Sequence, residues 1–402
     1  MIERLQISHL RNLTHINLSP AACNVIIGAN GSGKTSLLEA IFLLSRGKSF
    51  RHHQPKRYIQ HYQESATIHA NLNDSRTLAI QKKADATTIL RLNQTTVYNQ
   101  SILTEQLPTL LIDPSTMDML EQGSASRRQL LDWLVFHMKQ GFHSQWIAYQ
   151  RLLKQRNSLL KQRRHLTQVQ LAELKAWDKG LASHAALIHH YRQAIFEAWQ
   201  PYFSKSIAQL LPAYAEQLSL SYNAGYDTGI ALDIQLDERL EQDLQLGYTR
   251  IGNHRADIHV HWRSIGSRQI ADENLNSPLS ADSTVKLPIL KEQAANILSR
   301  GEKKLLITAL RLSQLPLLLN AKTNSELYNN DAKLSATPVV LLDDITAELD
   351  DKAIEILLST LAQLPCQVFV TSLTDSILPL VHKYWEKSQV FHMKQGGILP
   401  AQ

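Results

Sequence analysis

The positions of the apolar residues divide the chain into a strand-rich first part, a helical middle and a last part that mixes both. Alternating apolar positions at 65–70, 77–80 and 88–92 predict a β-meander within residues 1–100. Residues 101–220 contain little Gly or Pro, and their apolar spacing predicts helices almost throughout. Beyond residue 220, strand-like segments alternate with helical ones. The pattern therefore predicts an α/β protein whose helical middle lies between two strand-containing parts.

A glycine-rich turn follows the strand predicted at 24–27 and precedes the helix predicted at 36–44. It fits the nucleotide-binding P-loop, in which glycines let backbone amides approach phosphates and a helix N-terminus adds its unpaired N–H groups. Lys34 is expected to reach the outer phosphates, and the Thr35 hydroxyl is expected to hold Mg²⁺. The candidate nucleotide-binding residues are Gly28, Ala29, Asn30, Gly31, Ser32, Gly33, Lys34, Thr35 and Ser36.

Two acids follow the apolar strand predicted at 339–342, far along the chain from the P-loop. Such a pair could simply cap a strand at the surface. Combined with a P-loop, Asp343 is expected to contact Mg²⁺ and Asp344 to activate the attacking water. The sequence thus predicts Lys34, Asp343 and Asp344 as catalytic residues, with ATP and Mg²⁺ as cofactors.

A short turn opens the strongly helical stretch at 305–319, and it consists of Ser299, Arg300, Gly301 and Glu302. Its spacing fits two interpretations equally. One is an anion site made by a hydroxyl and free amides at a helix N-terminus. The other is an ordinary N-cap, in which Glu302 completes a capping box with Ser299. Its position shortly before the Asp343 strand resembles the signature motif of ABC-type ATPases, in which the signature of one subunit closes on the ATP of another. The resemblance implies two half-sites per chain and an ATP-dependent homodimer.

Segments along nearly the whole chain resemble the RecF family, the bacterial recombination mediators related to the SMC ATPase heads. They are Leu5–Leu13, Gly47–Arg51, Arg127–Asp132, Arg156–Lys161, Trp177–Asp178 and Gly252–Asp257. The resemblance implies an ABC-type P-loop ATPase head. Its mixed β-sheet lobe is expected to comprise residues 1–100 and 221–402, with an inserted, mostly helical arm at 101–220.

The resemblance also implies an activity. It implies an ATP-dependent DNA-binding protein of recombinational repair and replication-fork maintenance, with links to DNA damage and the SOS response. Its ATP-driven dimer would clamp DNA at gaps and single/double-strand junctions and promote recombinase loading with RecR- and RecO-type partners. A slow, DNA-stimulated ATPase is expected. The slow hydrolysis is consistent with Asp344, which stands where many relatives in the wider class carry the longer glutamate. The alternative is an ABC-type ATPase coupled to DNA nuclease activity, which needs a second acidic metal cluster that the sequence does not offer at convincing spacing.

The net charge of +6 favours an anionic partner, and the basic residues are concentrated at 151–164. They surround a face of leucines, which predicts a basic amphipathic helix. Charge runs are usually solvated faces, but Asp132 is the one acid between Glu121 and Glu173. A concentrated basic stripe is the footprint of phosphate-backbone binding, and the low aromatic content of 6% favours duplex contact over base stacking. The predicted DNA-binding residues are Arg151, Lys154, Arg156, Lys161, Arg163 and Arg164.

Several other features complete the prediction. The 402 residues contain two cysteines, no signal-peptide core and no apolar run near the ~20 residues of a membrane span, so a cytoplasmic protein is expected. The heptapeptide Val135–Gly141 recurs at Val390–Gly396, and we expect a helix in the first copy and a terminal hairpin in the second. The polar tracts Ser267–Val285 and Ala321–Thr337 are predicted to be surface loops.

Overall fold

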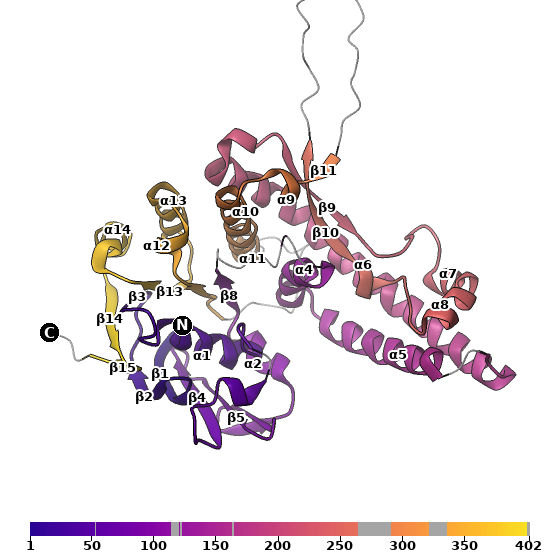
Figure 1. Ribbon diagram of the computed structural model, residues 1–402, viewed down its shortest axis with the longest axis horizontal. Helices are drawn as coiled ribbons and strands as arrows, with labels where there is room; N and C mark the ends of the chain where they lie inside the picture. Colours follow the sequence, from indigo (N-terminus) through magenta and orange to yellow (C-terminus); the bar gives the residue numbers. More distant parts are fainter. Residues whose placement is uncertain are drawn as a thin grey trace, which may run out of the picture. The chain divides into compact units, whose positions relative to one another are not determined.

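The computed structural model describes residues 1–52, 54–113, 120, 123–162, 165–263, 291–320 and 336–399 (Figure 1). The chain forms two compact units. The first comprises residues 1–117, 132–143 and 304–402, and the second comprises residues 118–131 and 144–303. Most of the two predicted polar loops lies outside the described residues.

An antiparallel sheet forms one layer of the first unit, in the order β2-β1-β4-β5-β6-β7. Its strands are β1 (Ile2–Leu10), β2 (Leu13–Leu18), β4 (Ser65–Leu72), β5 (Thr77–Lys83), β6 (Thr88–Leu92) and β7 (Thr95–Val97). Alternate residues of β4 and β5 are buried, as expected for strands with one face on the core. The predicted meander is confirmed.

A second sheet has the order β15-β14-β3-β13-β12-β8, and its strands run parallel from β14 to β8. The strands are β3 (Cys23–Ile27), β8 (Thr109–Ile112), β12 (Val339–Leu342), β13 (Gln367–Ser372), β14 (Ser388–Lys394) and β15 (Gly397–Ile398). Every residue of β3, β12 and β13 is buried, which explains why these strands are mostly apolar and do not alternate. Since β13 lies between β3 and β12, the carboxyl ends of these three strands meet at one edge of the sheet.

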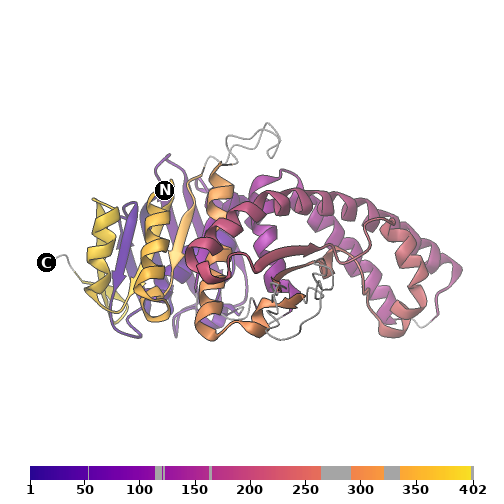
Figure 2. The same cartoon turned by 90° about the horizontal axis from the view of Figure 1, so that it is seen from above.

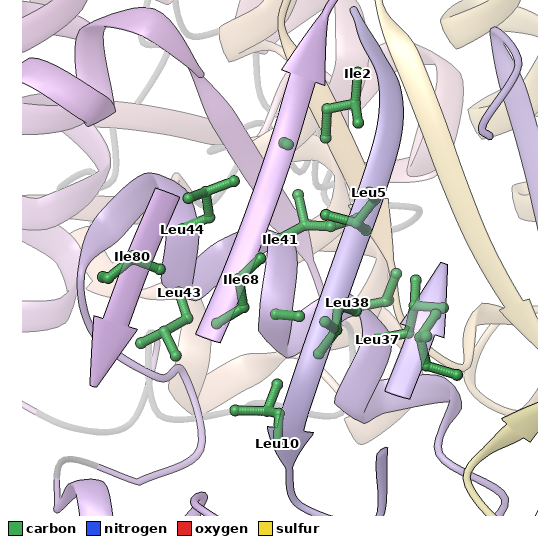
Figure 3. Packing of buried hydrophobic residues seen from close by; sticks show 14 of the residues in the cluster. Ile2, Leu5, Leu10, Leu37, Leu38, Ile41, Leu43, Leu44, Ile68 and Ile80 are labelled. Carbon is green, nitrogen blue, oxygen red and sulfur yellow. The ribbon is translucent and has the colours of Figure 1, made fainter. Parts of the chain in front are cut away.

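Helix α1 (Lys34–Arg46) packs its four leucines and its one isoleucine against the antiparallel sheet (Figure 3). In Figure 3, Ile41 lies beside Leu5 of β1, and Leu37 and Leu38 lie further along β1 toward Leu10. Leu43 and Leu44 approach Ile80 of β5 in the same view. The same buried cluster includes Leu341 and Phe369 from the parallel sheet, so the core of the unit lies between its two sheets. This packing fixes the position of α1, and with it the loop that precedes the helix, relative to the two sheets.

Several other α-helices belong wholly or partly to the first unit. They are α2 (Gln100–Gln106), the later part of α4 (Ser124–Met138), most of α10 (Arg300–Leu312), α11 (Gln314–Asn320), α12 (Ile345–Glu348), α13 (Asp351–Ala362) and α14 (Leu378–Tyr384). Asp350 caps α13 by accepting a hydrogen bond from the Ala353 amide at 2.8 Å. The orange-to-yellow C-terminal helices lie beside the strands in Figure 2.

The second unit is built on a pair of long helices and a small sheet. Its helices are α5 (Phe142–Gln162), α6 (Gln168–Leu210), α7 (Leu232–Glu238), α8 (Leu240–Leu246) and α9 (Ala294–Ile297), and its strands are β9 (Leu218–Asn223), β10 (Asp257–Arg263) and β11 (Lys291–Gln293). The strands pair antiparallel in the order β11-β10-β9. A Cβ on Gly180 of α6 would lie 2.7 Å from a methyl group of Leu152, so this glycine lets α5 and α6 approach closely.

The boundaries of the two units differ from the expected boundaries of the helical arm at residues 101 and 220. Strand β8 lies within the expected arm but pairs with β12 of the ATPase lobe. Conversely, β10 and the second half of β9 were expected in the lobe, but these two strands pair with each other and belong to the second unit. Apolar patterning predicts strands but not their partners, and here the partners set the division.

The repeated heptapeptide adopts two conformations, as predicted. Val135–Met138 ends helix α4, whereas Val390–Lys394 belongs to strand β14. In the strand, Phe391 and Met393 are buried and their neighbours are more exposed. Tertiary packing therefore selects the conformation of this peptide. Among the described helices, none is both long and apolar enough to cross a membrane.

Candidate nucleotide-binding site

A cavity of about 600 Å³ lies in the first unit at the carboxyl edge of the parallel sheet. The P-loop and the two acids after β12 line it together, although they are far apart in the sequence. The lining residues are Arg11, Asn12, Asn30, Gly31, Gly33, Lys34, Thr35, Ser36, Arg51, Ile59, His61, Asp343, Asp344 and Thr371. The sequence prediction that these two motifs belong to one site is thus met geometrically.

The P-loop follows β3 and leads directly into α1. Gly31 and Gly33 have φ angles of 77° and 113°, which residues with a side chain rarely adopt. A Cβ on Gly28 would lie 2.5 Å from the Met393 carbonyl oxygen, so this position must also be glycine. The chain therefore folds around the N-terminus of α1 in a conformation that only this glycine pattern allows.

Lys34 is the first residue of α1, and its ammonium group lies within the loop. Its Nζ donates to the carbonyl oxygens of Gly28 at 2.7 Å and Ala29 at 3.3 Å. Burial lowers the pKa of Lys34, while the nearby Asp344 and Asp343 partly oppose that shift. The ammonium group thus forms hydrogen bonds with the loop and interacts electrostatically with the two acids.

Asp343 joins three elements of the site. Its Oδ1 accepts hydrogen bonds from the Thr35 hydroxyl at 3.1 Å and from the Thr371 hydroxyl at 2.9 Å. Burial raises the pKa of Asp343, and the hydrogen bond from Thr371 opposes this shift. This carboxylate and the Thr35 hydroxyl are oxygen donors of the kind that Mg²⁺ prefers.

Asp344 has a different environment from that of its neighbour. Its backbone is left-handed, with φ 49°, and its amide donates to the Thr371 hydroxyl at 2.8 Å. Aspartate tolerates this conformation better than most residues. Its Oδ1 is buried and has no hydrogen-bond partner among the described residues. A buried acceptor without a partner is costly, and it suits a carboxylate that accepts a hydrogen bond from a bound water.

Sequence reasoning missed several lining residues, of which Asn12 is the best connected. Its Nδ2 donates to the Gly31 carbonyl oxygen at 2.9 Å, and its Oδ1 accepts from the Ser36 hydroxyl at 3.2 Å. The preceding Arg11 forms a two-bond ion pair with the fully buried Glu39 of α1. The Arg-Asn pair was visible as a family landmark, but only the pairing of β1 brings it to the P-loop.

The C-terminal hairpin supports the P-loop from behind. The Gly396 amide donates to the Ser32 carbonyl oxygen at 2.8 Å. Gly396 has φ 79°, and a Cβ there would lie 1.9 Å from the Asn12 carbonyl oxygen. The turn that ends β14 is therefore fitted tightly between the P-loop and the β1–β2 turn.

We predict that Gly396→Ala weakens ATP binding. The added methyl group must push the turn away from Asn12 and Ser32 at a cost of about 1–3 kcal/mol, the usual size of such backbone strain. Gly397→Ala is the matched control, because its Cβ would meet the Lys394 carbonyl oxygen at an ordinary 3.6 Å. Titration with a fluorescent ATP analogue compares the two variants. Equal affinities would mean that the hairpin does not support the loop.

In the second unit, the Ser299 turn forms a capping box at the start of α10. The Ser299 amide donates to Glu302 Oε2 at 2.8 Å, and the Glu302 amide approaches the Ser299 hydroxyl at 3.4 Å. Tyr214 adds a hydrogen bond to Glu302 Oε1 at 2.5 Å. Arg300 and Gly301 are exposed, and a Cβ on Gly301 would meet nothing within 4 Å. The ordinary capping interpretation is thus realised, and the middle of the turn is open.

The basic helix predicted at 151–164 corresponds to the later part of α5. Arg151, Lys154 and Lys161 are exposed, whereas Arg163 and Arg164 lie outside the described residues. Their roles as DNA contacts stay predictions.

The prediction for Arg156 is wrong, because its side chain is fully buried. Its Nε donates to Asp178 at 2.7 Å, and its Nη1 donates to Asp243 at 2.7 Å and to Thr249 at 2.8 Å. These acids come from α6 and α8, so a count of acids along the neighbouring sequence could not find them. Arg156 links three helices of the second unit instead of contacting DNA.

The fold and the site together define an ABC-type ATPase head. A model of the RecF/RecN/SMC N terminal domain matches residues 1–397. The "DNA replication and repair protein RecF" of Acinetobacter baumannii is 38% identical over 399 residues, covering 99% of this chain and 98% of that protein. Its counterpart from Acinetobacter baylyi is 39% identical over 373 residues, covering 92% and 91%. The chain therefore belongs to the RecF family.

Solved structures show the same fold. A structure of the recombination mediator protein RecF with ATP, from the RecFOR pathway, superposes with a TM-score of 0.76 at 21% identity, covering 100% of this chain and 97% of that one. The Smc head domain of Pyrococcus furiosus superposes with a TM-score of 0.52 at 16% identity, covering 99% and 94%.

Proposed function

We propose that this protein is an ATP-dependent DNA-binding protein of recombinational repair and replication-fork maintenance. The observation that carries the proposal is the single cavity lined by the P-loop, Asp343, Asp344 and Thr371. Relatives that match nearly the whole chain bear the name DNA replication and repair protein, and a RecF of the same fold has been solved with ATP.

The residues of the cavity fit ATP and Mg²⁺. The amides of the P-loop and the α1 N-terminus suit the phosphates, and Lys34 supplies a positive charge beside them. Thr35 and Asp343 would hold the cation, which when bound withdraws charge from the terminal phosphate. We propose that Asp344 orients a water and accepts its proton, which is supported by its buried Oδ1 without a partner among the described residues. Hydrolysis is expected to be slow and DNA-stimulated.

The exposed Ser299 turn is proposed to complete the ATP site of a second copy. Its capping box fixes the turn, and a Cβ on Gly301 would meet nothing within 4 Å, which supports the approach of a phosphate to this part of the helix N-terminus. ATP would then hold two copies together, and hydrolysis would release them. In the closed state the dimer clamps DNA at gaps and single/double-strand junctions. It promotes recombinase loading with RecR- and RecO-type partners.

Two variants test this proposal, the first by ATP-dependent dimerisation in the analytical ultracentrifuge and the second by its rate of phosphate release. Ser299→Arg should bind ATP normally but fail to dimerise, because the long cation fills the turn and replaces the capping hydroxyl. Lys34→Arg should fold normally and hydrolyse ATP more slowly, since arginine cannot reproduce the compact ammonium contact. ATP-dependent dimers of Ser299→Arg with the wild-type dissociation constant would count against a shared site.

A further inference from the structure

A second, shallower groove lies in the first unit, apart from the nucleotide cavity. It has a volume of about 480 Å³ and is formed by the C-terminal end of α1 and by β5, β6 and β7 with the turn that follows. Its polar and aromatic lining residues are Arg46, Lys82, Thr88, Thr96, Tyr98 and Gln100. None of the described residues that line it is acidic. The positive charge of the groove therefore favours an anionic ligand.

Lys82 occupies an unusual position on strand β5. Leu78 and Ile80 point into the core and are fully buried, and Lys82 is the next residue on that same face. Its Nζ donates to the hydroxyl of Thr88, its partner on β6, at 2.8 Å. Burial lowers the pKa of Lys82, and no acidic partner is found for it within the described parts of the chain. An ammonium group thus continues an apolar row without a counter-charge.

Arg46 supplies a second cation from the last turn of α1. Lysine and arginine at this position commonly bind the free carbonyl oxygens of the helix end. Here Gln100 Nε2 donates to the carbonyl oxygens of Leu44 at 3.2 Å and Ser45 at 2.9 Å instead. The guanidinium has no hydrogen bond or ion pair with the residues that the structure describes. Burial also lowers the pKa of Arg46 to about 10.

Two partly desolvated cations without counter-ions are costly for a fold, and an anionic ligand would offset that cost. Tyr98 also lines the groove, and 95% of its surface is accessible. A ring in that position suits a sugar or base next to a phosphate.

We propose that this groove binds a backbone phosphate of a nucleic-acid strand, with Arg46 and Lys82 as the counter-charges and the Thr88 and Thr96 hydroxyls as additional donors. This inference rests on the proposed function, since it gives the DNA of that function a contact on the ATPase unit. None of the exposed basic residues of α5 that the structure describes lines this groove.

The test compares Lys82→Gln with Lys83→Gln, in full-length protein with a non-hydrolysable ATP analogue. Lys83 is the neighbouring residue on the opposite face of β5 and does not line the groove. Anisotropy of a labelled gapped duplex is measured over a range of KCl concentrations. Lys82→Gln should weaken binding several-fold and lower the slope of log K against log salt by about 0.7–0.9, the value for one lost phosphate contact. Lys83→Gln should change neither, and Tyr98→Ala should weaken binding without changing the slope.

The outcomes separate this inference from the proposed function. If the wild-type protein binds no DNA, the proposed function fails. If it binds DNA and Lys82→Gln matches Lys83→Gln, the groove is overturned while the function stands. Calorimetry with free pyrophosphate distinguishes the source of the phosphate. Pyrophosphate binding that is lost only in Lys82→Gln, with DNA binding unchanged, would overturn the nucleic-acid assignment.

Discussion

Replacing Asp344 with asparagine should slow ATP hydrolysis by about 10²- to 10⁴-fold, the usual contribution of a positioned general base. The carboxylate has a buried oxygen without a partner, and its amide is fixed by the Thr371 hydroxyl. Asparagine keeps the shape and tolerates the left-handed backbone at this position, so the loop should not change. It cannot, however, accept a proton at neutral pH.

ATP binding provides the control for this variant. Asp344→Asn should retain ATP affinity, and its ATP-dependent dimers should persist longer than those of the wild-type protein, because hydrolysis no longer releases them. The measurements are phosphate release in multiple turnover and the lifetime of the dimer after dilution. A turnover rate within a few-fold of the wild-type rate would remove Asp344 from the catalytic site.

Replacing Arg156 with methionine should destabilise the second unit by about 3–5 kcal/mol, the cost of leaving buried partners of an ion pair uncompensated. Asp178 and Asp243 are almost as buried as Arg156 itself. Burial raises the pKa of Asp178 to about 6, although Arg156 attracts its charged form. Without Arg156 that carboxyl should be protonated more readily, so the loss of stability should be smaller at pH 5 than at pH 8.

Two further variants identify the cause of this loss. Lys154→Met removes an exposed cation two residues away, and its stability should stay within about 0.5 kcal/mol of the wild type, as for most surface substitutions. Adding Asp178→Asn and Asp243→Asn to Arg156→Met should recover part of the loss, because no unpaired charge is then buried. Urea unfolding, monitored by limited proteolysis of the second unit, measures the difference in stability between each variant and the wild type. If Arg156→Met were as stable as Lys154→Met, the buried ion pairs would not hold these helices together.

The sequence was sufficient for those parts of the site that are encoded locally. The P-loop can be predicted because three glycines and Lys34 stand between a strand and a helix, and Asp343 because it ends an apolar strand. Asn12 and Thr371 could not be predicted as site residues, because only the order of strands in the two sheets brings them to the cavity. Their residue types alone carry no such signal.

The same limit explains the two corrections. Arg156 belongs to a basic run in the sequence, but its charge is balanced by acids from two other helices. Strands β9 and β10 have ordinary alternating patterns, but they pair with each other and not with the strands of the ATPase lobe. In both cases the partner lies far away in the sequence, and periodicity contains no information about it.

We propose that each ATP site is made from two copies of the chain. Mixing two defective variants tests it most directly. Lys34→Ala lacks the P-loop cation, and Ser299→Arg lacks the signature turn, so each alone should be inactive. In a mixed dimer, both defects fall in one shared site and leave the other site intact.

Equal amounts of the two variants should therefore recover up to about half of the wild-type ATPase rate, since neither variant forms an active homodimer and each mixed dimer has one intact site of two. The rate should rise with protein concentration, because it depends on association. If each chain instead contained a complete site, the mixture would show only the summed rates of the two inactive variants at every concentration, and the shared-site model would be contradicted.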